Sequence, residues 1–493
     1  MTVSLADQII EKVAALKAER ANFEKLWQDV SELVLPRKSD FSVLRTPGAS
    51  RTRKQFETTA VQAAELLAAG IHGLMTNPAG RWFSLSFDGE RGLSDDVRAW
   101  IGEAEKIMRR EIAEPAASFA TNIHEVYLDL AVLGTAGLYV GWNENTDSLL
   151  FQSRFLGELF LEEDSVGCVS SVYRVFRWPL DKIVRTWGKS VLPESVSALC
   201  DNGGAERSDF EIIHAVTPNP LFVRDSAFQK PVRSVYVLKE AKTVLFSGGF
   251  DEMPLPVVRW SKATGEVYGR SPAIASLPDI KMLQEMMRET LISAQLANRP
   301  PVLVRDDDRF SPAATVPGGI IRYNGEVPKP FLSGANLSVG TEMMNEIRAR
   351  LRAAFYNDVL LTEQTGRMTA TEVVRRNEEK MILLGPVFGR IQTELLGPVI
   401  KRVFGLLLRH GKLPPLPAEF EGRLPDVSYL SPLSTAQSQI EARGIVETLE
   451  TSAGFLKLDP SAAGVFNVPK LVRKVASIYG VSPDLLTTEK TDE

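Results

Sequence analysis

The chain has 493 residues, a formal net charge of −5, and 44% apolar and 24% charged residues. This length accommodates about two to four domains with a sizeable core, and the slight acidic excess argues against a surface dedicated to tight DNA binding. Two cysteines, Cys168 and Cys200, exclude a disulfide framework and a cysteine-rich zinc site. The N-terminus lacks the features of a signal peptide, and no apolar run is long enough to span a bilayer.

The first 136 residues are predicted to be mainly helical. Ser4 with Asp7 resembles a helix-capping box and begins an amphipathic helix that is expected to reach about Leu35, before Pro36. Further helices are predicted over 57–76, 95–113 and 121–136. The polar segment between the first two helices is expected to be a loop, and it carries the basic residues Arg37, Lys38, Arg45, Arg51, Arg53 and Lys54.

From Gly137 to about Trp260 the hydrophobic period changes to two. Short runs rich in valine and aromatic residues, such as 138–142 and 172–176, lie between Gly, Asp and Pro residues. A short helix around 179–199 is expected to interrupt them. This pattern predicts an antiparallel sheet inserted between helices, and therefore an α+β fold that is mainly α.

Two further helices are predicted on either side of a segment with short strands. The first, over 278–298, begins with Pro278 and Asp279 and ends before the prolines at 300 and 301. The second spans 338–357. Residues 302–333 between them carry short strands and turns, and residues 358–368 form a loop that leads into another helix.

That next helix, predicted over 369–411, is the most distinctive feature of the chain. It begins with the capping box Thr369–Glu372 and ends at Gly411. The tetrapeptide Leu-Leu-Gly-Pro occurs within it at 383–386 and at 395–398. Each proline removes one backbone hydrogen bond, so the helix is expected to bend at these sites and to continue. Two shorter helices are predicted beyond it, around 434–453 and 468–479.

Motifs for catalysis or metal binding are scarce. Gly265–Ser271 is one residue too short for a phosphate-binding loop and has Arg for Lys, and Gly188–Ser190 lacks the leading glycine, so we interpret both as ordinary turns. An acidic triplet in a turn, as at Asp306–Asp308, is usually solvated. The histidines lack metal-ligand spacing, namely His72, His124, His214 and His410. The sequence therefore predicts no enzyme activity, no cofactor and no metal.

Four segments in register resemble one family, the head-to-tail connecting (portal) proteins of podovirus-type bacteriophages. The likeness covers nearly the whole chain in the order of the family. The segments are Tyr268–Asp279 with its methionine-rich helix and Arg299–Pro301, Met368–Val374 continuing to Pro386, Tyr429–Leu433 with Ala436, Gln437 and Glu441, and an N-terminal set of Arg20, Trp27, Leu35-Pro36, Thr58–Ala60 and Asn77-Pro78 before Trp82-Phe83.

The resemblance implies a ring, expected to have twelve copies, at one vertex of the phage capsid. Such a ring is assembled in the host cytoplasm and becomes part of the virion, and double-stranded DNA passes through it non-specifically during packaging and ejection. The resemblance also implies docking of the large terminase, of tail adaptor or nozzle proteins, and of capsid and scaffolding proteins. No membrane contact is implied.

The parts of a portal subunit map onto this sequence by position. They are a wing over 1–270 (helical over 1–136, β-rich over 137–260), a first stem helix over 271–299, a clip over 300–335, a second stem helix over 336–357, a tunnel loop over 358–368, a kinked wing helix with a linker over 369–429, and a helical crown over 430–493. In this arrangement the clip is the part that docks partners, and the tunnel loop narrows the channel.

The same mapping implies candidate site residues in three parts. The tunnel-loop residues expected nearest to DNA are Glu363, Gln364, Thr365, Gly366 and Arg367. Candidates for basic rings inside the stem are Lys281, Arg288, Arg348 and Arg352, and candidates for partner docking in the clip are Arg305, Asp306, Asp307, Asp308 and Arg309. A mixed-charge wall suits a sliding duplex, because each neutralised phosphate adds affinity that resists motion.

Other interpretations stay open at this stage. The loop could be a solvated turn without a partner, and each stem residue could form an ion pair between subunits or be a solvated surface charge. At the level of function, a packaging ATPase or nuclease would need a phosphate loop or clustered carboxylates. A helical scaffold or adaptor would form an oligomer without a channel.

Overall fold

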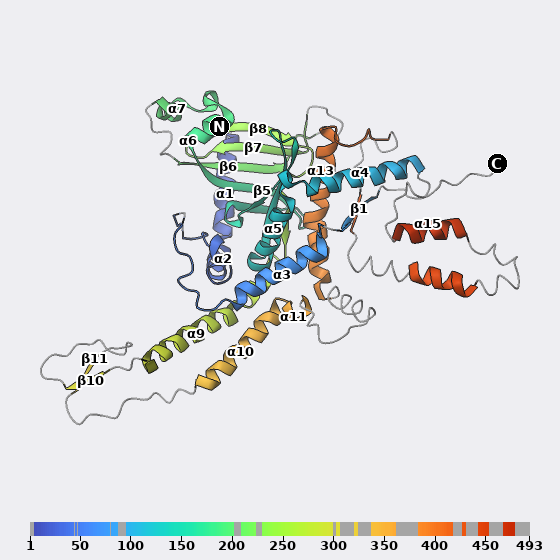
Figure 1. The fold of residues 1–493 in the computed structure, drawn as a ribbon. Helices are drawn as coiled ribbons and strands as arrows, with labels where there is room; N and C mark the ends of the chain where they lie inside the picture. The colour runs from blue at the N-terminus through green and yellow to red at the C-terminus, as the bar shows by residue number, and fades with distance from the viewer. Residues whose placement is uncertain are drawn as a thin grey trace, which may run out of the picture.

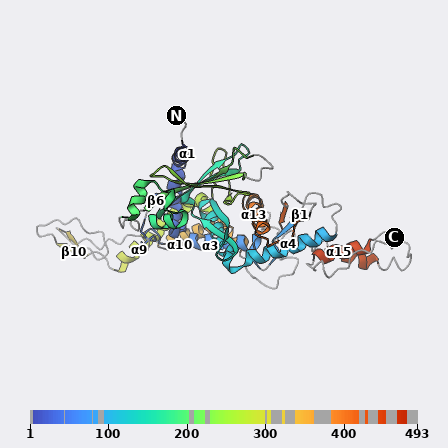
Figure 2. The same ribbon diagram turned by 90° about the horizontal axis from the view of Figure 1, so that it is seen from above.

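The computed structural model describes residues 4–43, 45–46, 48–78, 80–86, 95–201, 209–222, 229–298, 302–305, 320–323, 337–360, 383–417, 426–429, 442–452 and 467–478. These residues form helices and several antiparallel sheets, which confirms the predicted α+β class (Figure 1). Two helices, α9 (Leu277–Asn298) and α10 (Leu337–Ala354), project side by side from the body, and α15 (Val468–Ile478) lies on its other side (Figures 1 and 2). None of the described helices combines the length and the apolar character needed to cross a bilayer.

The N-terminal region forms two helices, α1 (Leu5–Glu19) and α2 (Ala21–Val34), so the prediction of one continuous helix is wrong. The break lies at Arg20, whose guanidinium donates to the backbone carbonyls of Gly157 and Leu159 and lies over the ring of Phe160, 3.6 Å from its centroid. These contacts hold the end of α1 against the β-rich region. The predicted cap is present, because Ser4 Oγ accepts a hydrogen bond from the Asp7 N–H at 3.1 Å.

The centre of the body is a helical layer. It consists of α2, α3 (Thr59–Met75), α4 (Asp95–Ala113) and α5 (Phe119–Leu133). Every residue of α5 from Val126 to Leu133 is buried, which explains why this part of the helix is so apolar. A strand that the sequence did not predict, β1 (Phe83–Ser86), pairs antiparallel with β12 (Asp426–Tyr429) and so joins distant parts of the chain.

The segment with period two is antiparallel sheet, as predicted, but it forms two sheets where one was expected. The smaller sheet has the strand order β3-β2-β9, with β2 at Thr135–Asn143, β3 at Ser148–Arg154 and β9 at Val257–Arg259. The larger sheet runs in sequence order, with β4 at Leu159–Glu163, β5 at Val169–Pro179, β6 at Asp209–Pro218, β7 at Val232–Leu238 and β8 at Thr243–Phe250. Helix α1 packs on one face of this sheet. Helices α6 (Leu180–Trp187) and α7 (Glu194–Asp201) cover part of the other.

The direction in which α9 leaves the body is set by a close contact between two turns. Gly134, with φ of +79°, ends α5, and a Cβ atom on Gly269 would lie only 2.2 Å from the Gly134 carbonyl oxygen. The Gly269 N–H donates to Thr135 Oγ1 at 2.8 Å, and Ser271 Oγ donates to the Val132 carbonyl at 2.6 Å. Ser271 also caps α8 (Pro272–Ala275), the short helix before α9. The turn before the first projecting helix is therefore fixed to the end of the most buried helix.

The described part of the long helix continues through its second proline. Residues 383–390 are helical, Ile391–Leu396 form a π-helical turn, and α13 (Gly397–Arg409) follows. Pro398 has no N–H, so one bond of the α-helical ladder is missing at this position. In the π-helical turn just before it, the Gly397 N–H donates to the Gln392 carbonyl, five residues earlier in the chain. The predicted C-terminal cap is confirmed at Gly411, with φ of +66° and a Lys412 N–H···O=C Leu407 bond of 2.9 Å. The capping box Thr369–Glu372 lies outside the described residues.

Candidate functional site: the projecting helices and their junction with the body

The projecting helices α9 and α10 bury only the ends that lie next to the body. On α9 the buried apolar residues are Leu277, Ile280 and Leu283, and on α10 they are Met344, Ile347 and Leu351. No described residue of α9 beyond Gln284 is buried. Three large apolar side chains of these helices are exposed, at 40%, 46% and 50%, namely Met282, Leu291 and Met343. These three side chains therefore have no cover within the described part of one subunit.

The two helices meet the body at a junction formed by Glu57, Gln284 and Arg348. The Gln284 side chain accepts hydrogen bonds from the N–H groups of Phe56 and Glu57, at 2.7 and 3.0 Å, and donates to the Glu57 carbonyl at 2.7 Å. The Glu57 carboxylate accepts from the Thr59 N–H at the start of α3 and from Arg348 Nε of α10, at 2.9 and 3.2 Å. One short segment before α3 thus binds both projecting helices.

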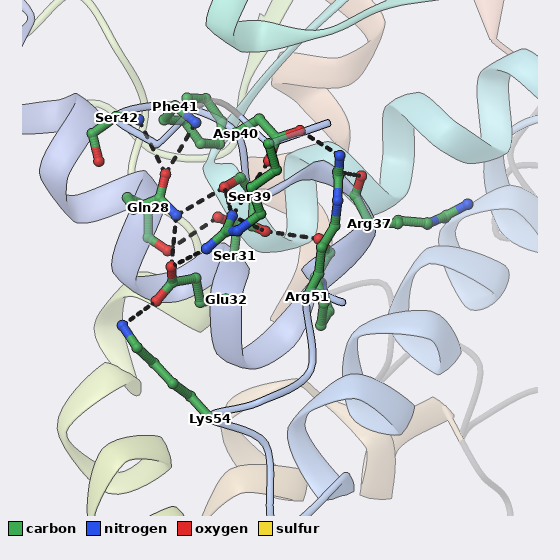
Figure 3. A network of polar contacts seen from close by, with 12 residues as sticks. Gln28, Ser31, Glu32, Arg37, Ser39, Asp40, Phe41, Ser42, Arg51 and Lys54 are labelled. Carbon is green, nitrogen blue, oxygen red and sulfur yellow. Dashed lines mark hydrogen bonds and ion pairs between the residues drawn. The ribbon is translucent and has the colours of Figure 1, made fainter. Parts of the chain in front are cut away.

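The loop that leads from α2 to this segment is held on α2 through Gln28 (Figure 3). Gln28 is 6% exposed, and its Oε1 accepts from the N–H groups of Phe41 and Ser42 at 3.0 and 3.1 Å. Its Nε2 donates to the Ser39 carbonyl at 2.8 Å. Each polar atom of this buried amide is therefore satisfied by the loop that follows α2, as burial of an amide requires.

Glu32, one turn further along α2, anchors the rest of the loop (Figure 3). Its carboxylate accepts from Arg45 Nη2 at 2.7 Å and from Lys54 Nζ at 2.6 Å. Burial opposes ionisation of Glu32, but hydrogen bonds from Lys54, Gln28 and Arg45 outweigh it and lower the pKa of the carboxyl. The loop therefore reaches Glu57 in a fixed position.

The predicted basic loop is confirmed, and most of its positive charge is neutralised within the subunit. Arg45 and Lys54 pair with Glu32, and Arg51 pairs with Asp40 at 2.5 Å. Lys38 pairs with the buried Asp129, and both Arg37 and Lys38 pair with Glu125. Among the described residues Arg53 has no such partner. This segment is therefore not a free phosphate-binding surface.

The junction makes a first prediction. Replacing Glu57 with Gln is expected to lower the free energy of unfolding by about 1–2 kcal/mol, because Arg348 loses its counter-ion and α3 loses a charged acceptor at its start. Urea unfolding at constant ionic strength measures the effect. Glu285→Gln is the matched control, since Glu285 is 59% exposed and pairs with Arg288 on its own helix, and it is expected to change stability by less than about 0.5 kcal/mol. Equal effects of the two substitutions would contradict the importance of the junction.

Three of the four basic stem candidates form ion pairs within the subunit. Lys281 pairs with Asp29 of α2 at 2.6 Å, and Arg288 pairs with Glu285 and Glu289 at 2.5 and 3.1 Å. Arg348 pairs with Glu57. Arg352 is exposed and has no ion pair with a described residue. It is therefore the candidate whose charge is most available to a partner.

The structure describes the beginning of the expected tunnel loop. Helix α10 ends at Ala354, three residues before the predicted end, because Tyr356 adopts a left-handed conformation with φ of +58°. Helix α11 (Asn357–Leu360) follows, so the first residues of the expected loop are helical. A Cβ atom on Gly70 of α3 would lie 2.7 Å from Leu360 Cδ1, which shows close packing of α11 on α3. Glu363, Gln364, Thr365, Gly366 and Arg367 lie outside the described residues.

The segment between the projecting helices contains the predicted short strands. β10 (Val302–Arg305) and β11 (Ile320–Tyr323) pair in parallel at the far end of α9 (Figure 1). Of the docking candidates, Arg305 is the last residue of β10. Asp306, Asp307, Asp308 and Arg309 lie outside the described residues. The structure thus places one candidate of this set at the outer end of the projecting helices.

A buried ion network that the sequence analysis missed connects the kinked helix to the sheets. Arg259 is 1% exposed and donates from Nη2 to Glu394 Oε1 at 2.7 Å and from its backbone N–H to Glu394 Oε2 at 2.9 Å. It also pairs with Glu163, which Lys262 contacts as well. Glu394 belongs to the π-helical turn. The sequence feature from which this network could have been inferred is Arg259 itself, a charged residue within the apolar run 254–260.

The possible phosphate loops and two of the histidines have structural roles. In the turn Gly265–Ser271 the N–H groups of Gly269 and Arg270 donate to Thr135 and Ser261, so they are not free to hold a phosphate. Lys189–Val191 forms a single 3-10 turn. The rings of His214 and His410 stack on Tyr236 and Trp142, each at 3.9 Å. The described residues contain no group of three acidic, histidine or cysteine side chains arranged for a metal ion.

Several of the described residues that carried the family resemblance pack in or against the core. Trp27 packs edge-on against Tyr268 at 5.0 Å and donates from Nε1 to the Leu133 carbonyl at 3.0 Å. Arg20 lies over the Trp27 ring at 5.9 Å. Tyr429 donates from its hydroxyl to the Gln392 carbonyl at 3.1 Å, in the π-helical turn. Segments far apart in the sequence thus contact one another as parts of one fold.

Comparison with known proteins assigns this fold to a family. Residues 6–486 match the family described as "Bacteriophage head to tail connecting protein", and the chain belongs to that family. Over 97% of its length the chain is 29% identical to the "Probable portal protein" of Bordetella phage BPP-1, of which the match covers 88%. It is also 25% identical to the "Portal protein" of Salmonella phage epsilon15, with 98% of this chain and 89% of that protein covered, and 23% identical to the "Portal protein" of Escherichia phage T7, with 82% and 75% covered.

Proposed function

We propose that this chain is the subunit of a phage portal, a ring at one capsid vertex that connects head and tail and through which double-stranded DNA is packaged and ejected. The observation that carries the proposal is the match to the head-to-tail connecting family over residues 6–486. The pair of projecting helices, joined to the body through Glu57, supports it. In this proposal the chain is a structural protein and not an enzyme.

The exposed surface of the projecting helices is suited to a ring. A closed ring needs a heterologous interface, in which one flank of each subunit binds the other flank of its neighbour. Met282, Leu291 and Met343 are exposed apolar residues on the two projecting helices. We assign them to contacts with neighbouring copies, because burying such side chains stabilises an assembly by about 25 cal/mol per Å² of apolar surface.

The parts of the subunit follow from this proposal. Helices α9 and α10 form the stem, and the wing is the body described over 4–270. The segment around β10 and β11 is the clip, which docks the large terminase during packaging and tail adaptor or nozzle proteins afterwards. The region from 430 onward is the crown, and capsid and scaffolding proteins contact the outside of the ring. We propose twelve copies, assembled in the host cytoplasm and retained in the virion.

The proposal also specifies which residues line the channel. Residues 363–367 face the DNA, and Arg352 contributes a ring of positive charge near the loop. The net charge of −5 keeps the binding of phosphates weak overall, so that the duplex slides in both directions. The paired residues Lys281, Arg288 and Arg348 then line or brace the stem without acting as strong phosphate contacts.

Electron microscopy and native mass spectrometry of the purified protein test the proposal. We expect rings with a central hole and a mass equal to twelve subunits. A strictly monomeric or dimeric particle at micromolar concentration would contradict it. Rings without a hole, or open helical oligomers, would favour the scaffold interpretation.

The stem interface makes a second prediction. Leu291→Asp is expected to shift the protein from rings to monomers, because it places a charge in an apolar contact between copies. Val166→Asp is the matched control, since Val166 is 83% exposed in the turn between β4 and β5, and rings are expected to persist. Analytical ultracentrifugation distinguishes the two states. If Leu291→Asp left the ring fraction unchanged, our assignment of Leu291 to a contact between neighbouring copies would be wrong.

The packaging ATPase interpretation is tested by its own assay. It predicts ATP turnover by the isolated chain that is lost in Lys189→Ala. We expect no turnover in either protein, because Gly188–Ser190 leads into a 3-10 turn and the N–H groups of the turn at 265–271 are already used. Turnover that depends on Lys189 would overturn this part of the proposal.

A further inference from the structure

Positive charge gathers between the two sheets of the body, away from the projecting helices. In the smaller sheet Tyr139 of β2 is opposite Gln152 of β3, and Gly137 is opposite Arg154. Tyr139 and Arg154 therefore share one face of this sheet. A Cβ atom on Gly137 would lie 2.6 Å from Leu159 Cδ1 of β4. This face of the smaller sheet is thus directed toward the larger one.

The larger sheet carries a row of polar side chains next to this face of the smaller sheet. Arg174 of β5 is opposite His214 of β6, and His214 is opposite Tyr236 of β7. The three side chains therefore lie in one row on one face of the sheet. His214 stacks on Tyr236 at 3.9 Å and exchanges a 2.9 Å hydrogen bond with Ser234. Burial lowers the pKa of His214 to about 3, with Arg174 and Arg154 acting in the same direction, so this ring is neutral.

The two arginines are not equally compensated. Arg174 Nε donates to Glu158 Oε2 at 2.7 Å. Arg154 is half-buried, its Cζ lies 5.1 Å from the Tyr139 ring centroid, and its hydrogen bond goes to the neutral amide of Gln152. No carboxylate among the described residues pairs with it. Around this face, two guanidinium groups therefore share one carboxylate, which leaves one surplus positive charge.

Burial and the neighbouring guanidinium both disfavour the charged form of Arg154. Burial and the nearby Arg174 together lower the pKa of Arg154 to about 10, and the opposing effects of Glu158, Tyr139 and Tyr236 are smaller. Burial raises the pKa of Tyr236 to about 12, so its hydroxyl keeps its proton and stays a hydrogen-bond donor. A partly buried cation without a counter-ion is unfavourable, and an anion at this position would offset that cost.

We propose that Arg154 and Arg174, together with the hydroxyl groups of Tyr139 and Tyr236, bind a phosphate-type oxyanion between the two sheets. A guanidinium presents two parallel N–H groups that match two oxygen atoms of such an anion, and a tetrahedral anion has further oxygen atoms for the two hydroxyls. The anion connects the smaller sheet to the larger one. This site is independent of the channel and of the portal function.

Inorganic phosphate is the probe for this site. Calorimetric titration and thermal unfolding are performed on the full-length protein at constant ionic strength, with chloride as the reference and acetate as a carboxylate of similar charge. Phosphate is expected to raise the unfolding temperature by about 2–3 °C at ~100 times its Kd. Acetate is expected to have less effect, because it lacks the tetrahedral set of oxygen atoms. An equal or larger effect of acetate would contradict a phosphate-type site.

Substitutions locate the binding. Arg154→Gln is expected to weaken phosphate binding by about tenfold or more, and Tyr139→Phe, which keeps the charge, by about two- to tenfold. Arg177→Gln is the matched control, since Arg177 lies on the same strand as Arg174, is 63% exposed and pairs with Glu211. It is expected to bind phosphate as the unmodified protein does. The inference is overturned if the unmodified protein shows no phosphate response, or if Arg154→Gln and Tyr139→Phe respond as the control does. If Arg154→Gln fails to fold, the Tyr139→Phe result decides.

Discussion

Rings that lack residues 362–366 are expected to assemble normally and to fail in DNA packaging or in DNA retention. The described contacts that hold the projecting helices to the body, at Glu57, Gln284 and Arg348, do not include this segment. Helix α11 packs against α3 before the deleted residues begin. Removal of the segment should therefore widen the channel without weakening the subunit.

The deletion is measured in two assays. Electron microscopy reports whether rings form, and the DNA content of assembled particles reports packaging and retention. Replacing the same five residues with glycine and serine is the control, because it keeps the length of the loop and removes its charged and amide side chains. If the shortened protein forms no rings, the loop has a role in assembly and our placement of it in the channel is wrong. Normal DNA content in the deletion would equally contradict the proposed lining.

Loss of the Arg259 side chain is expected to cause the largest loss of stability among the substitutions we consider. Arg259→Met should lower the free energy of unfolding by about 3–5 kcal/mol, because it leaves Glu394 and Glu163 without their main partner in a largely buried position. Arg259 is 1% exposed, while the two carboxylate side chains are 17% and 18% exposed. The substitution also weakens the contact between the π-helical turn and β9, which then depends on the hydrogen bond from the backbone N–H of residue 259 to Glu394.

Urea unfolding of single and double variants measures the Arg259 network. In Arg259→Met with Glu394→Gln, the loss is expected to be smaller than the sum of the two single losses, because the two side chains act on each other. Arg270→Met is the matched control, since Arg270 is 48% exposed and pairs with Glu266 on a surface turn, and it should cost less than about 1 kcal/mol. A loss no greater for Arg259→Met than for Arg270→Met would refute the role that we give to the network.

Much of the fold could be predicted from the sequence because its periodicity is local. The change from helical period to period two near residue 137 located the sheets. Gly411 located the end of the kinked helix, and the helix passes Pro398 as expected, through a π-helical turn. These features depend on residues a few positions apart, so a single sequence contains them.

The remaining features depend on contacts between distant segments. The predicted N-terminal helix breaks at Arg20 because carbonyl groups at 157 and 159 hold its guanidinium. The pairing of β1 with β12, and the junction of Glu57 with Gln284 and Arg348, leave no periodic signal in the sequence. The candidate site was located by family resemblance alone, and the structure adds the contacts that position it.

Three of the residues that carry the family resemblance have structural roles. Arg20, Trp27 and Tyr268 form one packed group, in which Tyr268 also accepts a hydrogen bond from the Leu161 N–H at 3.3 Å. This group joins α1, α2 and the sheets to the turn before α9. Similar residues at these positions in other portal proteins would preserve the direction in which the stem leaves the wing, whatever partner the clip docks.

A reconstruction of the assembled particle by electron microscopy, with the radial position of residues 358–368 read from the density, is the most direct test of the account. We predict twelve subunits around an open axis, with this segment at the smallest radius and α9 and α10 side by side around the channel. Density that places the segment on the outer surface, or inside a subunit that touches no other copy, would contradict a DNA channel lined by this loop.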